Sequence, residues 1–186
     1  MKHTRILKPP AAAIGVLMLL APPLWASECM RLCNPRFMQD ASPSDIQIEI
    51  DRGANIDGRD DNLNTPLHFA SFWGNDAAMR ALLAAGADPN INTESGLTLL
   101  HLAANAQTVQ LAVQAGLDIH ARARNGQTPL HVASRWGNTN TIMALLAAGA
   151  NPETSDNAGR RPGDLAVLNP NLAGTYIVQR LEKTQQ

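Results

Sequence analysis

Aromatic side chains are scarce in this chain of 186 residues, and neither basic nor acidic residues are in clear excess. Phe, Trp and Tyr together make up 4% of the residues, whereas alanine is abundant. This composition suits thin, close-packed helices better than a sheet sandwich. The formal net charge is −1, which argues against a general nucleic-acid-binding protein.

Signatures of catalysis are also missing from the sequence. We find no Ser-His-Asp arrangement, no paired carboxylates, no Walker motif and no glycine-rich phosphate loop. We therefore expect a protein that is not an enzyme, has no catalytic residues and needs no cofactor.

Long apolar runs are absent as well. The longest, Ala11 to Ala21, covers eleven residues, whereas a membrane-spanning helix needs about 20. Three basic residues and no acidic residue precede the run, and a segment ending in the small residue Ala26 follows it. This order predicts a cleaved secretory signal rather than an uncleaved membrane anchor. A lipoprotein signal at Cys29 is disfavoured, because Glu28 stands where a small residue is needed.

Removing residues 1–26 leaves 12 Lys and Arg (15 − 3) against 16 Asp and Glu, a net charge of −4. The sequence has no N-x-[ST] sequon free of proline, which favours a bacterial periplasm over a eukaryotic secretory route. We expect a periplasmic or secreted bacterial protein that is not stably inserted in the membrane after cleavage.

Both cysteines, Cys29 and Cys33, follow the predicted cleavage site. In an oxidising compartment we expect them to form a structural disulfide, whose small loop limits the stabilisation to about 2 kcal/mol. The spacing lacks the C-x-x-C pattern of redox enzymes. Metal binding or redox use of this pair is the least favoured alternative.

One phrase occurs twice in the sequence. "NTPLHFASFWGN" begins at Asn64 and "QTPLHVASRWGN" begins at Gln127, and nine of their twelve positions are identical. "LTLLHLAA" from Leu97 is a third copy, and "RRPGDLAV" from Arg160 is a degenerate fourth. A second phrase, such as "AAGADPN", recurs in step with the first. The period is about 33 residues, shortened to 30 in the middle copy.

Each copy predicts two short helices. Thr65 and Thr128 are expected N-caps, and Pro66 and Pro129 follow at the first helical position, where a missing N–H costs nothing. A glycine ends this helix, and a second helix with an apolar stripe follows an asparagine cap. Helices this short are unstable alone, so the copies must stack into one continuous core.

The recurring T-P-L-H-x-A and G-A-D phrases resemble the ankyrin repeat, and the whole chain resembles exported bacterial ankyrin-repeat proteins. The resemblance implies an all-α ankyrin-repeat solenoid of helix-turn-helix repeats with β-turn loops. We expect a signal peptide (1–26), a cysteine-containing segment (27–40), an N-terminal capping repeat (41–59), three central repeats (60–92, 93–122 and 123–155) and a C-terminal capping repeat (156–186).

The repeat also assigns a role to its histidines, His68, His101 and His131. Stacked repeats would place them about 10 Å apart, too far apart to ligate one zinc ion. In ankyrin repeats this position ties neighbouring loops by hydrogen bonds, so the resemblance implies a structural role and no metal site. The expected structural set is Thr65, Pro66, His68, His101, Thr128, Pro129 and His131.

The middle repeat departs from the pattern. Leu99 replaces the proline, and the W-G-N turn between the two helices is lost. Two readings stay open here, neutral drift tolerated in a turn and a notch made for a partner. In either case we expect this repeat to make the weakest contacts with its neighbours and to open more readily than the other repeats.

The resemblance implies a non-catalytic module that binds a partner protein through its concave face and loop tips, as a monomer. An immunity-type inhibitor of a delivered toxin and a regulator of a periplasmic enzyme are alternatives within this class. Aromatic and arginine anchors dominate interface energetics. The expected partner-binding residues are Asn62, Asn64, Phe72, Trp73, Glu94, Leu97, Asn105, Arg124, Gln127, Arg135, Trp136 and Arg160. For Trp73 and Trp136, packing in the groove between repeats stays an alternative.

Overall fold

The computed structural model describes residues 29–183, so the predicted signal peptide lies outside the described residues. The described part forms ten α-helices and a short 3-10 helix, η3. Their bounds are Met30–Cys33 (η3), Pro35–Asp40 (α1), Pro43–Asp51 (α2), Pro66–Trp73 (α3), Asp76–Ala84 (α4), Leu99–Leu102 (α5), Ala106–Gln114 (α6), Pro129–Trp136 (α7), Thr139–Ala147 (α8), Pro162–Ala166 (α9) and Tyr176–Lys183 (α10).

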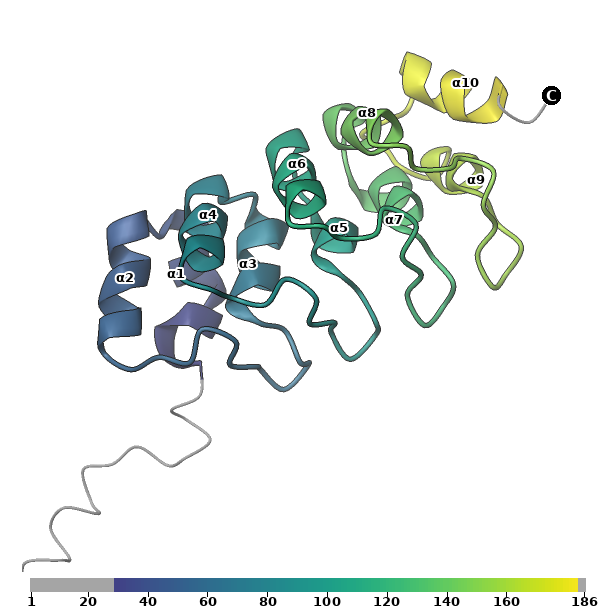
Figure 1. Ribbon diagram of the computed structural model, residues 1–186. Helices are drawn as coiled ribbons and strands as arrows, with labels where there is room; N and C mark the ends of the chain where they lie inside the picture. The colour runs from purple at the N-terminus through teal and green to yellow at the C-terminus, as the bar shows by residue number, and fades with distance from the viewer. Residues whose placement is uncertain (1–28, 184–186) are drawn as a thin grey trace, which may run out of the picture.

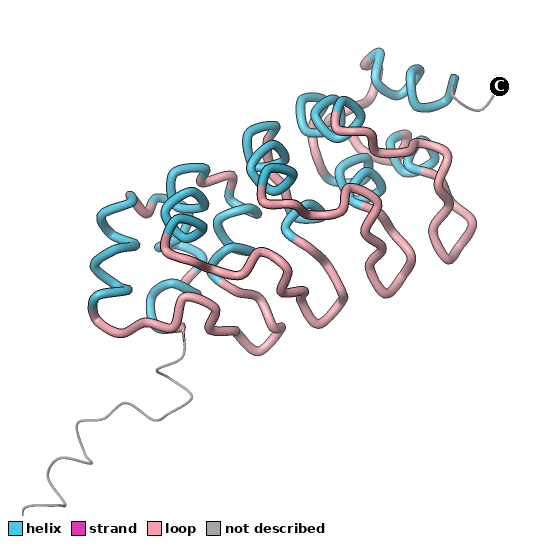
Figure 2. The backbone as a smooth tube through the Cα atoms, in the orientation of Figure 1, coloured by secondary structure: helices cyan, strands magenta, loops and turns pink. Residues whose placement is uncertain are grey.

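The helices stack in two rows, and the loops between successive helix pairs project from one edge (Figures 1 and 2). The odd-numbered helices α1, α3, α5, α7 and α9 contact each other in sequence, as do α2, α4, α6 and α8. This arrangement confirms the predicted all-α ankyrin-repeat solenoid. We call the projecting loops fingers one to four; they comprise residues 57–64, 90–97, 120–127 and 153–160.

Local capping explains where the first helix of each repeat begins. Thr65 and Thr128 are the N-caps of α3 and α7, and each is followed by proline. The backbone N–H of Thr65 donates to Nδ1 of His68 at 3.1 Å, and Thr128 donates to His131 in the same way. The threonine and the histidine three residues later therefore satisfy each other's polar groups at the buried start of the helix.

The apolar stripes of the second helices form the core. Met79 and Leu82 of α4 and Ile142 and Leu145 of α8 have no solvent exposure. Each such side chain contributes about 1.5–3 kcal/mol when it is fully buried. Because they belong to one continuous cluster that extends from α1 to α10, every repeat depends on its neighbours for its burial.

The N-terminal cap is a helix pair, α1 and α2, that stacks on α3 and α4. Ser42 caps α2 in a capping box with Asp45, and Asn34 caps α1. The capping unit thus begins at Asn34, inside the segment predicted as separate. Cys29 precedes η3 and Cys33 is its last residue; their Cα atoms lie 5.4 Å apart, a separation that disulfide-bonded cysteines commonly show.

The middle repeat has lost half of its first helix. Helix α5 has four residues, whereas α3 and α7 have eight. The chain after α5 is nevertheless hydrogen-bonded to both neighbouring repeats. The N–H of Ala104 donates to the Ser71 carbonyl at 3.1 Å, and the Ala104 carbonyl accepts from Asn138 Nδ2 and Thr141 Oγ1, both at 3.1 Å. The repeat is therefore shortened without leaving the backbone N–H and C=O of Ala104 unpaired.

Candidate functional site

A groove of about 670 Å³ lies over the shortened helix α5, between α3 and α7. Phe72 at the end of α3 and Trp136 at the end of α7 line its sides. Residues 102–104, at the end of α5, and Val132 of α7 also line it. The groove has the size of a typical ligand-binding site, and the missing half of α5 accounts for its position.

The two aromatic walls are open to solvent. Phe72 is 55% exposed and Trp136 is 72% exposed. Phe72 meets Trp73 edge-to-face with ring centroids 5.2 Å apart. The guanidinium of Arg135 stacks 4.4 Å from the centre of the Trp136 ring, and its Nη1 donates to the Leu168 carbonyl at 3.0 Å. Each aromatic side chain is thus supported from one side by a neighbour.

The groove is uncharged. Among the described residues that line it, none carries a formal charge, and the polar ones are hydroxyl, imidazole and amide side chains. The amides belong to Asn125, Gln127, Asn138 and Asn171. A surface of this composition favours a neutral, partly apolar ligand segment over a phosphate or another strongly charged group.

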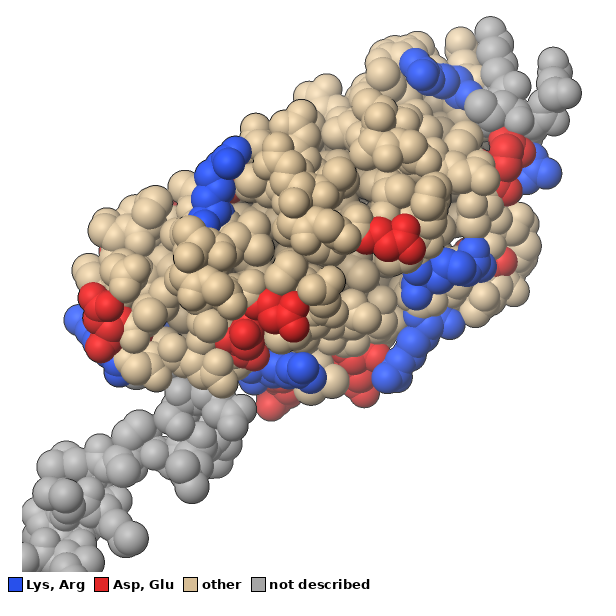
Figure 3. All heavy atoms as spheres, in the orientation of Figure 1, with Lys and Arg blue, Asp and Glu red and all other residues tan. Residues whose placement is uncertain are grey.

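Charged side chains gather instead mainly along the edge formed by the fingers (Figure 3). A second recess, of about 290 Å³, lies between fingers two and three. Glu94 and Arg124 both line it, and both are exposed. The fingers are joined by backbone hydrogen bonds, because the N–H of Glu94 donates to the Asn62 carbonyl and the N–H of Arg124 donates to the Ser95 carbonyl, both at 3.0 Å.

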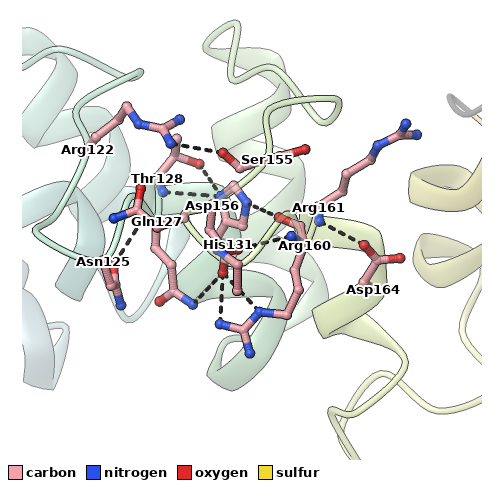
Figure 4. A network of polar contacts seen from close by, with 12 residues as sticks. Arg122, Asn125, Gln127, Thr128, His131, Ser155, Asp156, Arg160, Arg161 and Asp164 are labelled. Atoms are coloured by element: carbon pink, nitrogen blue, oxygen red, sulfur yellow. Dashed lines mark hydrogen bonds and ion pairs between the residues drawn. The ribbon is translucent and has the colours of Figure 1, made fainter.

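Two of the repeat histidines, His101 and His131, link successive repeats. Nε2 of His101 lies 3.0 Å from the Gln127 carbonyl of the next finger, and Nε2 of His131 lies 3.0 Å from the Arg160 carbonyl (Figure 4). Since Nδ1 accepts from the threonine N–H at the helix start, the bond to the carbonyl requires the proton on Nε2. These rings are therefore neutral and serve to hold the fingers in place.

Burial makes the repeat histidines hard to protonate. It lowers the pKa of His68 and of His101 to about 4, and it also lowers the pKa of His131. His68 differs from the other two in its second contact. The Leu97 carbonyl lies close enough to favour its protonated form, but Nε2 of His68 makes no regular hydrogen bond.

Finger four is organised around the buried carboxylate of Asp156 (Figure 4). Nε and Nη2 of Arg160 donate to it at 3.0 and 2.8 Å, and the N–H of Ala158 donates at 2.9 Å. Burial alone would raise the pKa of Asp156, but these hydrogen bonds outweigh burial and lower it to about 2. The predicted binding residue Arg160 is therefore engaged within its own finger.

The structure brings only some of the predicted binding residues together. Four line the groove, namely Phe72, Leu97, Gln127 and Trp136, and Glu94 and Arg124 line the recess beside it. Trp73 and Arg135 support the two aromatic walls from outside. Asn62 is exposed on finger one, where the side chain of Asn64 donates to Asp60 at 2.9 Å.

Asn105 does not occupy the position that corresponds to Phe72. It was expected on the concave face at the level of Phe72, but it is the half-buried N-cap of α6 and accepts from the Thr108 N–H at 2.8 Å. Its amide also donates to the Gly74 carbonyl at 3.1 Å. Compared with the first repeat, the middle repeat lacks three residues before this cap. Asn105 therefore corresponds to the cap Asn75 of the first repeat.

Sequence reasoning also missed several residues of the groove. Val132 precedes Trp136 by one helical turn, so helical spacing alone would have placed both on one face. Leu102 and Asn171 carried no such signal. Leu102 lines the groove because α5 ends there, and Asn171 reaches it from the turn after α9.

Residues 29–183 contain neither a membrane-spanning helix nor a cluster of metal ligands. This part of the chain contains no helix with both the length and the apolar content needed to cross a membrane. Nor do three or more His, Cys, Asp or Glu side chains gather there in a way that would hold a metal ion.

Known protein families match most of the described chain. A family model described as ankyrin repeats in three copies matches residues 80–156 and 100–176, and one described as ankyrin repeats in many copies matches residues 48–103. Together these matches extend over the groove and all four fingers.

Curated relatives are much longer proteins. Rabankyrin-5 of Homo sapiens and palmitoyltransferase AKR1 of Lachancea kluyveri are each 31% identical over 145 residues, which is 74% of this chain but 12% and 18% of theirs. Neurogenic locus notch homolog protein 1 of Xenopus laevis is 31% identical over 175 residues, 88% of this chain and 7% of its own. The chain therefore spans less than a fifth of the length of these relatives.

Proposed function

Because this chain belongs to the ankyrin-repeat family, whose repeats generally mediate protein–protein interaction, we propose that it binds a partner protein through the groove between α3 and α7. The protein acts by binding and carries out no reaction itself. The partner also contacts the tips of fingers two and three, which adjoin the groove.

A single observation carries this proposal. The shortened α5 leaves an uncharged groove between two exposed aromatic side chains, Phe72 and Trp136. Fully burying an aromatic side chain contributes about 1.5–3 kcal/mol, and aromatic anchors in pockets are the commonest interaction hot spots. Covering both rings would therefore supply a large part of the affinity of an ordinary interface.

The experiment is a pull-down from periplasmic extract with the double variant Phe72→Ala/Trp136→Ala. A matched control is Ile48→Ala/Tyr176→Ala, which removes two exposed apolar side chains from α2 and α10, outside the groove. We expect the groove variant to lose a specific partner by tenfold or more and the control to retain it. If the groove variant folds normally and keeps every specific partner, the binding surface lies elsewhere.

We further propose that the protein is exported to the periplasm after cleavage near Ala26. The support is the order of basic, apolar and small residues in the first 26 positions. In that compartment the partner would be an enzyme that the protein regulates or a delivered toxin that it inhibits. Intact-mass analysis of the native protein from fractionated cells tests the export. Recovery from the cytosol with Met1 still attached would contradict it.

A further inference from the structure

Two opposite charges line one recess without neutralising each other. Glu94 on finger two and Arg124 on finger three are both exposed at the recess of about 290 Å³. Within residues 29–183, neither side chain forms an ion pair. Finger four differs, because Arg160 pairs with Asp156 at 2.8 Å and Arg161 pairs with Glu153 at 3.0 Å.

This charged recess is continuous with the uncharged groove. Ser95, Leu97 and Asn125 line both. A segment that lies in the groove and extends towards the finger tips would therefore pass from an apolar surface to one with a fixed order of charges. The acidic charge lies on the side of finger two and the basic charge on the side of finger three.

We propose that the partner presents a segment with an uncharged apolar run for the groove and, next to it, one basic and one acidic residue. The basic residue pairs with Glu94 and the acidic residue pairs with Arg124. The inference rests on the proposed function and names the chemistry of the partner. Complementary charges of this kind set orientation and reject wrong partners more than they add affinity.

The charge order has consequences for recognition. A uniformly acidic or basic segment would gain one pairing and suffer one repulsion at the recess. A segment of the right composition whose basic and acidic residues are interchanged would place like charges together at both positions. The recess thus selects both the composition of the segment and the order of its charges.

A charge-exchange experiment tests this directly. A display library of random peptides of about 12 residues, each up to about 40 Å long when extended, is selected on the purified protein. Dissociation constants of the enriched peptides are then measured for the wild type, for Phe72→Ala/Trp136→Ala and for the exchange variant Glu94→Arg/Arg124→Glu. The exchange keeps the net charge and alters only exposed side chains.

We expect enriched peptides to combine an apolar run with one basic and one acidic residue. The exchange variant should bind them about tenfold more weakly at low salt, with a smaller difference at high salt. A peptide whose acidic and basic residues are interchanged should recover the affinity for the exchange variant.

Failure of the inference differs from failure of the proposed function. Peptides that need Phe72 and Trp136 but bind the exchange variant unchanged would refute the charge order and leave the groove as the binding site. Enrichment of peptides that bind the Phe72→Ala/Trp136→Ala variant normally, or no enrichment, would count against both.

Discussion

Acidification from pH 7 to pH 5 should destabilise the fold through the buried histidines. Burial lowers the pKa of His68 and His101 to about 4, from about 6.5 in the unfolded chain. In this interval the unfolded chain binds protons that the folded rings do not. Their contribution to stability is therefore complete above pH 6.5 and is lost as the pH falls towards 4.

The magnitude follows from the two pKa values of each ring. With values of about 6.5 and about 4, each ring removes about 2 kcal/mol from the free energy of unfolding between pH 7 and pH 5. His68 and His101 together therefore remove about 4 kcal/mol, a large part of the 5–15 kcal/mol of a typical domain. For a domain of this size the melting temperature should fall by roughly 8–16 °C.

The assay is urea unfolding followed by circular dichroism at pH 7, 6 and 5. His101→Gln removes the titrating ring and retains an amide that can accept from the Thr98 N–H and donate to the Gln127 carbonyl. This variant should lose about half of the pH dependence. His120→Gln, at an exposed position on finger three, is the matched control and should keep it. A wild-type free energy that stays flat from pH 7 to pH 5 would refute the reasoning.

Three further predictions concern the fingers, the cysteines and the middle repeat. Leu63 has a left-handed backbone (φ 60°) at the position where finger three has Gly126. In thermal melts Leu63→Gly should therefore leave the stability of the fold unchanged or raise it by up to about 1 kcal/mol. Gly126→Ala should destabilise the fold, because the added Cβ would lie 2.8 Å from the backbone of finger four. Cys29 and Cys33 should form an intrachain disulfide, seen as a gain of two mass units on reduction; ready alkylation without reductant would contradict it. Amide hydrogen exchange should be faster in α6 than in α4 and α8, because the short helix α5 gives α6 a smaller surface to pack against. Equal protection of the three helices would contradict a less stable middle repeat.

The parts of the fold that depend on local chemistry could be predicted from the sequence. Threonine before proline, with histidine three residues later, specifies a helix start at α3 and α7 without any tertiary information. The stripe of Met79 and Leu82 identifies the buried side of α4 for the same reason. These signals lie within one or two helical turns, so they can be read from neighbouring residues.

The parts of the fold and of the candidate site that depend on contacts between repeats were harder to predict from the sequence. Asn105 was assigned to the concave face because it follows the histidine at a similar distance to Phe72. Only the bonds that it makes to Thr108 and Gly74 identify it as a cap. The salt bridge that engages Arg160 likewise depends on Asp156 being buried, which sequence spacing alone did not indicate. Exposed arginine and asparagine side chains have many alternative partners, and only the folded backbone selects among them.

The deletion in the middle repeat shows how a local loss opens a groove. Asn75 follows Thr65 by ten positions, but Asn105 follows Thr98 by seven, so the missing residues are those that would end the first helix. Their removal leaves a space between Phe72 and Trp136, which then line opposite sides of the groove.

The same deletion would ordinarily leave backbone groups unpaired at the shortened turn, at a cost of about 1–3 kcal/mol each. Here Ala104 donates to Ser71 of the first repeat and accepts from Asn138 and Thr141 near the start of α8. The groove is therefore lined by a turn whose hydrogen bonds are made, which keeps its shape fixed before a partner arrives. A groove whose turn is already hydrogen-bonded would lose less entropy on binding a partner than a loose turn would, as the hypothesis of a notch made for a partner requires.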